Sequence, residues 1–265
     1  MWNAAGFTAF LAGPITTIER LGLQTQSIDE CVMNKDINGK QCTTLWHVDD
    51  LKMSHVDQGV LDDILNDLNE RHGKEAPLTV TRGTKHEYLG MTIDFSKEGK
   101  ATISMDDSVD GILNEAREDT AGMISSPAGK HLFTVNKTNP VSLSEEDGKH
   151  FHTMTAKLLF LAKRARPDLL QAVSFLTTRV KKPDVDDYKK LCRVIRYLRH
   201  VPHLSLTLEA DNSHIIKWWI DASFAVHPDM KSHTGGTMSL GKGSIYSTST
   251  RQKLNTTSST EAELV

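Results

Sequence analysis

Trp46-His47-Val48-Asp49-Asp50-Leu51 is the stretch that decides the fold of this 265-residue chain. Two adjacent carboxylates, Asp49 and Asp50, stand at the end of an apolar segment, where their mutual repulsion needs a compensating partner. Mg²⁺ is one such partner because it prefers carboxylate oxygens, and two-metal polymerases hold attacking and leaving oxygens in line with such groups. An isolated Asp-Asp pair is more commonly a solvated turn or a helix cap. Only the surrounding sequence can therefore favour a metal site over this simpler interpretation.

The segments around this pair predict a β-hairpin with the aspartates at its tip. Residues 29–35 and 41–48 have strand-like composition, and Asn38-Gly39 between them is a strong turn signal. Residues 51–54 begin the returning strand. Further elements are expected downstream: a helix over 57–72, strands over 78–81, 87–95 and 99–104, and a helix from about 107 to 117.

The second half of the chain changes from a linker to helices and then to strands. Residues 120–148 are rich in Ser, Pro, Gly, Asn and Lys, which predicts a linker or long loop. Pro167 ends the first helix because proline cannot donate the hydrogen bond that a helix interior needs. The expected elements are helices from about 145, over 170–177 and over 186–200, strands over 204–208, 215–223, 234–240 and 243–249, and a capped helix opening at 257–261. The predicted fold class is α+β.

Composition excludes several classes of protein. The 38% hydrophobic and 25% charged contents are those of an ordinary globular chain, and no apolar run reaches membrane-spanning length or follows a basic leader. The three cysteines are widely spaced, which argues against a disulfide framework or a cysteine zinc site and favours a reducing, intracellular compartment. His150 and His152 have no third ligand at a suitable spacing, so surface histidines are the favoured interpretation.

The net charge of −3 hides a basic block. Between Lys157 and Arg199 there are twelve Lys and Arg residues but four acidic residues. Basic residues clustered on helices are typical of proteins that bind phosphate backbones. A merely solvated helical face explains this region equally well when it is taken alone.

Several motifs occur in an order that is specific to one lineage. They are Trp46-His47-Val48-Asp49-Asp50, Glu87-Tyr88-Leu89-Gly90-Met91, Leu158-Leu159-Phe160-Leu161-Ala162 with Arg166-Pro167-Asp168, Val194-Ile195-Arg196-Tyr197-Leu198, Lys231-Ser232-His233-Thr234-Gly235-Gly236, and Ser258-Ser259-Thr260-Glu261-Ala262-Glu263. From about residue 20 to 265 the chain resembles the reverse transcriptase–RNase H region of copia-type LTR retrotransposon polyproteins.

This resemblance implies roles for individual residues. Asp49 and Asp50 would be paired metal-site carboxylates of the polymerase palm, helping to position Mg²⁺ on the nucleotide phosphates and the primer 3′-hydroxyl. Tyr88, Leu89 and Gly90 would place the primer end. Asp221 and Glu263 would be the first two metal-binding carboxylates of the RNase H part, although Asp221 alone could be a polar residue at a strand end.

The basic block would grip the backbone of a template–primer duplex, with tolerance for sequence and sensitivity to salt. The residues expected to contact nucleic acid there are Lys163, Arg164, Arg166, Arg193 and Arg196. The implied partners are an RNA or DNA template–primer, deoxynucleotides and other parts of the polyprotein, in a cytoplasmic particle or the nucleus, without a membrane. Trp218 and Trp219 could stack on bases, but a position in a core is the favoured expectation.

The resemblance also divides the chain into parts. Residues 1–22 form an unassigned lead-in, and residues 23–105 correspond to the C-terminal part of the palm. Residues 106–203 correspond to the thumb and connection helices. Residues 204–265 correspond to the N-terminal part of an RNase H domain.

Three departures from the family pattern bear on activity. His47 stands where the family usually has Tyr, no equivalent of the first palm aspartate is found before Asp49, and Val265 precedes the remaining RNase H carboxylates. The expectation is therefore a polymerase fragment that is inactive alone. The alternatives are a nucleic-acid-binding remnant without catalysis and an inert, unstable product.

Overall fold

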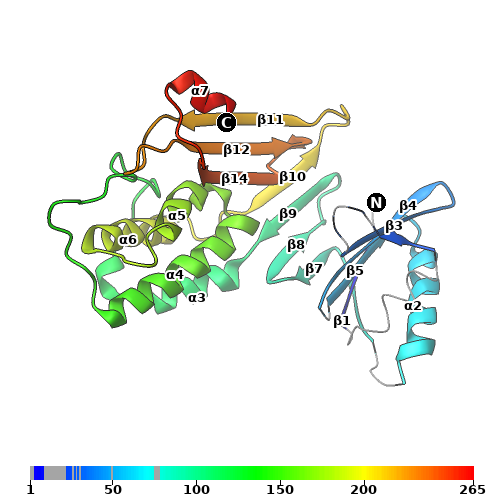
Figure 1. Ribbon diagram of the computed structural model, residues 1–265. Coiled ribbons are helices and arrows are strands. Elements are labelled where there is room, and N and C mark those ends of the chain that lie inside the picture. Colours follow the sequence, from blue (N-terminus) through cyan, green and yellow to red (C-terminus); the bar gives the residue numbers. More distant parts are fainter. Residues whose placement is uncertain are drawn as a thin grey trace. The chain divides into compact units, whose positions relative to one another are not determined.

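A computed structural model describes residues 3–8, 22–25, 27, 29, 31–48, 50–74 and 78–265. The fold class is α+β, as predicted, with antiparallel sheets and, among these residues, six α-helices (Figure 1). The chain divides into two compact units, Met1–Thr102 and Ile103–Val265. The helices and strands that follow Thr102 therefore lie in one unit.

The first unit contains a six-stranded sheet with the order β2-β3-β4-β5-β1-β6. Its strands are β1 (Asn3–Thr8), β2 (Gln24–Thr25), β3 (Val32–Ile37), β4 (Lys40–His47), β5 (Asp50–His55) and β6 (Thr79–Gly83). The expected Asn-Gly turn joins β3 to β4, and both residues have the positive φ that a two-residue hairpin favours. No element was expected within residues 1–22, yet β1 pairs with both β5 and β6. This strand was not expected because it is stabilised by pairing with two strands far away in the chain, and a local sequence pattern carries no information about such pairing.

Helix α2 (Gln58–His72) supplies much of the first unit's core. Asp57 caps its start by accepting a hydrogen bond from the Gly59 N–H at 2.9 Å. The predicted apolar stripe of this helix is buried. The core cluster consists of Leu23, Met33, Cys42, Leu51, Met53, Leu61, Ile64, Leu65 and Leu68.

The segment expected as one strand over 87–95 is instead a hairpin. Strand β7 (Lys85–Tyr88) pairs with β8 (Met91–Asp94). Both belong to a sheet separate from the six-stranded one, in which β9 (Lys100–Ser104) lies next to β8. Leu89 and Gly90 form the two-residue connection with φ values of 52° and 73°. Gly90 adopts this conformation freely, whereas Leu89 is strained by its Cβ.

The second unit begins with helices near the predicted positions. They are α3 (Asp106–Glu115), α4 (Glu145–Arg164), α5 (Leu170–Thr177) and α6 (Val185–His200), with 3₁₀ turns at Glu118–Thr120 and Pro167–Leu169. The loop before α4 is irregular, as expected, but it is packed. Leu132 is buried, and the ring of Phe133 meets that of Phe175 edge-on at 5.6 Å.

The strands of the second unit are β10 (Leu206–Ala210), β11 (Lys217–Ser223), β12 (His233–Ser239), β13 (Gly241–Lys242) and β14 (Tyr246–Arg251), followed by α7 (Ser259–Leu264). β13 pairs with β10. β11, β12 and β14 form an antiparallel sheet in that order, with α7 beside β11 (Figure 1).

Candidate nucleic-acid and metal sites

Asp50 is the described member of the predicted carboxylate pair, because Asp49 lies outside the described residues. Asp50 begins β5 and stands opposite His47 across the hairpin. Val48, in the connection, is exposed and has a φ of 53°, which costs a β-branched residue backbone strain. The hairpin tip was predicted, and strain at such a tip is a common feature of functional loops.

Tyr88 comes close to Asp50, although 38 positions separate them in the chain. The pKa of the Tyr88 hydroxyl is raised, first by burial and then by the negative charge of Asp50, with smaller effects of Cys31 and Asp29. A carboxylate opposes the phenolate only when the two groups are near each other. The fold therefore brings the Tyr88-Leu89-Gly90 turn to the same region of the first unit as Asp50.

Lys52 is a polar residue in this unit that the motifs did not indicate. Its side chain is 8% exposed and its Nζ atom has no hydrogen-bond partner, although it lies 5.8 Å from the centroid of the Phe95 ring. Burial lowers the pKa of this amine to about 8. Burial and then the charge of Lys52 lower the pKa of the neighbouring His86. The sequence does contain a sign of this buried amine, because Lys52 stands between the apolar residues Leu51 and Met53 of the strand.

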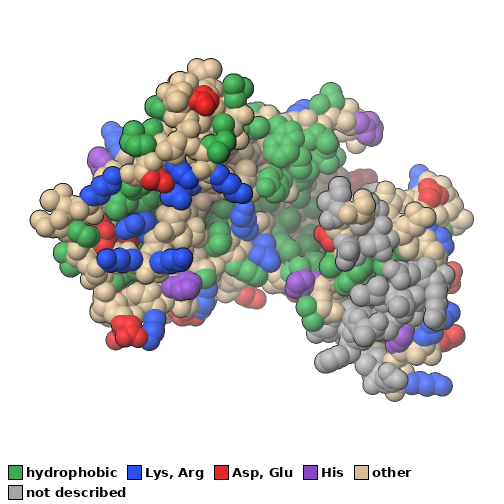
Figure 2. Space-filling view, viewed as in Figure 1, with side chains coloured by type: hydrophobic (Ala, Val, Ile, Leu, Met, Phe, Trp, Pro, Cys, Tyr) green, Lys and Arg blue, Asp and Glu red, His purple; other side chains and the backbone are tan. Residues whose placement is uncertain are grey.

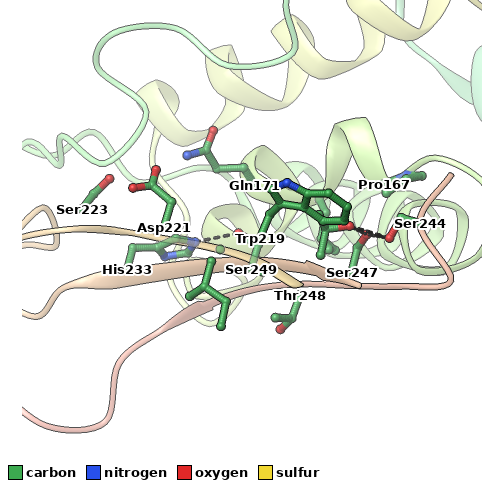
Figure 3. A pocket seen from close by; sticks show the side chains of 15 residues that line it. Pro167, Gln171, Trp219, Asp221, Ser223, His233, Ser244, Ser247, Thr248 and Ser249 are labelled. Atoms are coloured by element: carbon green, nitrogen blue, oxygen red, sulfur yellow. Dashed lines mark hydrogen bonds between the residues drawn. The ribbon is translucent and has the colours of Figure 1, made fainter. Parts of the chain in front are cut away.

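One face of the three-stranded sheet, called here the Trp219 face, lines a cavity. Strand register places its residues in cross-strand rows, and they are Trp219, Asp221 and Ser223 of β11, Thr237, Gly235 and His233 of β12, and Ser247 and Ser249 of β14. Pro167, Leu170 and Gln171 close the opposite side of the cavity, which has a volume of about 610 Å³. Figure 3 shows Trp219 and Asp221 projecting toward the side on which Gln171 lies.

Glu263, on helix α7, lies beside β11, the strand that carries Asp221. The backbone N–H of Ala222 donates a hydrogen bond of 3.2 Å to Oε1 of Glu263, which places that carboxylate beside the residue that follows Asp221. Helix α7 is held by Gln252, whose amide donates to the carbonyl of Ala262 at 2.7 Å. Asp221 is exposed and has no ion-pair partner in the part of the chain that the structure describes.

A hydrogen-bonded chain of buried polar groups lies at the floor of this cavity. Nε2 of His233 is 2.6 Å from Oγ of Ser249, and its Nδ1 is 3.0 Å from Nε2 of His227. Burial and then the proximity of His227 lower the pKa of His233 to about 4, and burial also lowers the pKa of His227. Both rings are therefore neutral near pH 7. The sequence singled out His233 only as part of a motif.

The five predicted phosphate contacts divide into accessible and inaccessible groups. Lys163 is exposed, while Arg164, Arg193 and Arg196 are half-buried, and Figure 2 shows Lys and Arg side chains gathered over the helices of this unit. Arg166 is only 1% exposed. Its guanidinium donates from Nε and Nη2 to the carboxylate of Asp168 and from Nη1 to the carbonyl of Val201. The expectation that Arg166 contacts phosphate is therefore corrected, because its guanidinium is buried and already hydrogen-bonded to Asp168 and Val201, so a phosphate cannot reach it.

The described residues do not place three or more His, Cys, Asp or Glu side chains where they could hold a metal ion together. Asp50, Asp221, Glu263, His150 and His152 are among these described residues, whereas Asp49 is not. Across the same part of the chain, the helices are too short or too polar to span a membrane.

Comparisons with known proteins bear on the whole chain. No protein-family model matches it. It is 24% identical over 221 residues to a transposon Ty5-1 protein of Saccharomyces cerevisiae, a match that covers 83% of this chain and 69% of that protein. It is 25% identical over 249 residues to the retrovirus-related Pol polyprotein from transposon TNT 1-94 of Nicotiana tabacum, which covers 92% of this chain.

The matches to Pol polyproteins involve a small share of those longer proteins. The chain spans 18% of the tobacco polyprotein. A 118-residue stretch is 34% identical to the Pol polyprotein from transposon RE2 of Arabidopsis thaliana, covering 44% of this chain and 8% of that protein. Over most of its length, the chain is thus distantly related, at about 25% identity, to copia-type retrotransposon Pol polyproteins.

Proposed function

We propose that this chain is a reverse transcriptase–RNase H segment of a retroelement polyprotein and that it binds template–primer duplexes. In this proposal residues 23–105 belong to the palm, 106–203 to the thumb and connection, and 204–265 to the RNase H part. The observation that carries the proposal is the position of Asp50 at the start of β5, opposite His47 in the β4–β5 hairpin, together with the charge of Asp50 acting on the Tyr88 hydroxyl. The family resemblance assigns both residues to one polymerase site, and the distant relation to Pol polyproteins supports the same assignment.

Lys163, Arg164, Arg193 and Arg196 are the proposed contacts with backbone phosphates. Lys163 and Arg164 have no acidic partner within the described residues, so their charges are available to a polyanion. Contacts of this kind release counterions and do not select bases. Four of them predict a slope of log K against log salt of about −3 to −4.

Asp50 in the first unit, and Asp221 with Glu263 in the second, are the proposed Mg²⁺ ligands. Their fit rests on chemistry: carboxylate oxygens suit a hard cation, and neither Asp50 nor Asp221 is in an ion pair with another described residue. Bound Mg²⁺ would supply charge stabilisation at phosphate oxygens. Each centre has two named carboxylates, counting Asp49, and a two-metal centre short of a ligand holds its cations poorly. We therefore expect no turnover by this chain alone.

A binding protein without catalysis is the second candidate, favoured by the unpaired charges of Lys163 and Arg164. The deciding experiment measures duplex affinity at several salt concentrations, together with primer extension and RNA cleavage in Mg²⁺. The double variant Lys163→Met/Arg164→Met should reduce the salt slope by about 2, whereas Lys189→Met, which removes a lysine already paired with Asp186, should leave it unchanged.

The three measurements separate the candidates. Salt-dependent binding that is insensitive to Asp50→Asn and Asp221→Asn, without turnover, favours the binding protein. Mg²⁺-dependent primer extension that disappears in Asp49→Asn would show an active polymerase and contradict the expected inactivity. Duplex affinity that does not change with salt would contradict both candidates.

A further inference from the structure

Trp219 is unusually accessible for a tryptophan in a sheet. Its side chain is 54% exposed, and it lines the cavity between α5 and the Trp219 face. An indole that is open to solvent beside a cavity of about 610 Å³ offers a flat surface in a space large enough for a ligand of nucleotide size. Aromatic rings in such positions stack on nucleic-acid bases without selecting among them.

A cluster of hydroxyl groups lies next to the indole. Trp219 stands opposite Thr237, which stands opposite Ser247, so the three side chains form one cross-strand row. Thr237 donates a hydrogen bond to Ser244 at 2.5 Å, and the Ser244 and Ser247 hydroxyls are 2.7 Å apart. Hydroxyl groups both donate and accept hydrogen bonds, which suits them to ribose hydroxyls and in particular to the 2′-hydroxyl of RNA.

The charged side chains differ between the two ends of the cavity. Asp221 lies two residues from Trp219 on the same face, about 7 Å along the strand, and its carboxylate repels phosphate when no cation is bound. At the other end, a second cavity of about 210 Å³ shares Pro167, Ser244 and Ser247 with the first and is lined by Lys163 and Arg164. An anionic phosphate is therefore favoured at the end nearest these two cations.

We propose that this pair of cavities binds one unstacked nucleotide of a single-stranded RNA segment, with its base on Trp219, its sugar at the Thr237–Ser244–Ser247 hydroxyls and its phosphate near Lys163 and Arg164. This subsite rests on the proposed function, since it adds a single-strand contact to a chain that binds duplexes. The juxtaposition of an exposed indole, hydroxyls and cations along two cavities that share Pro167, Ser244 and Ser247 carries the inference.

Trp218 provides a matched control, because it is on the same strand with similar exposure (50%) but projects from the opposite face, where it meets Tyr246. The experiment measures binding of the full chain to a labelled single-stranded RNA of about eight nucleotides by fluorescence anisotropy. Trp219→Ala should weaken this binding tenfold or more, on the order of one lost base stack. Trp218→Ala should leave it within about twofold, a change under 0.5 kcal/mol.

The sugar contact has its own measurement. Wild-type protein should prefer RNA over DNA of the same sequence, and Ser247→Ala should reduce that preference. Thr250→Ala, on the same strand but on the opposite face and outside both cavities, should retain it. Equal affinity of the wild type for RNA and DNA would overturn the assignment of the hydroxyl cluster.

The outcomes distinguish this subsite from the proposed function. If the chain binds duplex with the expected salt slope but Trp219→Ala and Trp218→Ala bind single strands equally, only the subsite is overturned. If it binds neither duplex nor single strand, the proposed function fails as well. Circular dichroism and thermal unfolding of each variant establish that any loss of affinity comes from a folded protein.

Discussion

Lys52 is a buried cation whose amine has no hydrogen-bond partner, so it should destabilise the first unit. Lys52→Met keeps the apolar stem and removes the charge, and we expect it to raise the free energy of unfolding by about 1–3 kcal/mol. Lys40→Met, at an exposed position in the first hairpin, is the matched control and should change little. Urea unfolding followed by circular dichroism measures both, and destabilisation by Lys52→Met would contradict this account.

The same lysine predicts a pH dependence. Its pKa is about 8 in the folded chain and 10.5 in an unfolded one, so between these values the unfolded state binds more protons. Stability should therefore rise as the pH increases from 8 to 10.5. The difference in unfolding free energy between wild type and Lys52→Met isolates this effect, and a difference that stays constant over that range would refute it.

His233 predicts a dependence of the same sign at acid pH. Its pKa is about 4 when folded, against 6.5 when unfolded, so protons bind the unfolded chain preferentially between these values. Its contribution to stability should be complete above pH 6.5 and should be lost as the pH falls toward 4. His233→Gln should be less stable at pH 7, because the Ser249 contact changes, but its stability should depend less on pH. Equal slopes in the two proteins would exclude His233 as the source.

At the scale of elements, α6 depends on its capping box. The Asp184 carboxylate accepts the Asp187 N–H at 2.8 Å, the Asp187 carboxylate accepts the Asp184 N–H at 3.1 Å, and Arg179 donates to Asp187 at 2.9 Å. Asp184→Ala removes the cap, and we expect it to cost about 1–2 kcal/mol of unfolding free energy. Asp186→Ala, in the same turn but half-buried and outside the capping box, is the control. Equal urea midpoints for the two variants would show that the box contributes little.

At the scale of the whole molecule, we expect the edge strand β11 to limit solubility. Ile220 is 59% exposed, and the face that it shares with Trp218 carries further exposed apolar groups. Such an edge pairs readily with another chain. Ile220→Lys should raise the concentration at which the protein remains monomeric, measured by light scattering. Val141→Lys, which changes an exposed apolar residue in a loop, should have little effect; equal gains would point to net charge instead.

Local patterns predicted most of the elements but not how distant ones combine. The Asn38-Gly39 turn and the stripe of α2 were predictable, because turn conformation and helical period depend on neighbouring residues. The break at Leu89-Gly90 was missed because a leucine at positive φ contradicts its own preference. Of the candidate site residues, Arg166 alone changed its interpretation through burial.

The sequence by itself determined the α+β class, the motif order and the residues worth testing, since these depend on residue type and short spacing. Tertiary structure alone decided that β1 lies between β5 and β6, that Tyr88 lies near Asp50, and that α5 closes a cavity over Trp219. These arrangements depend on pairing and packing between segments far apart in the chain, and no local preference encodes such contacts.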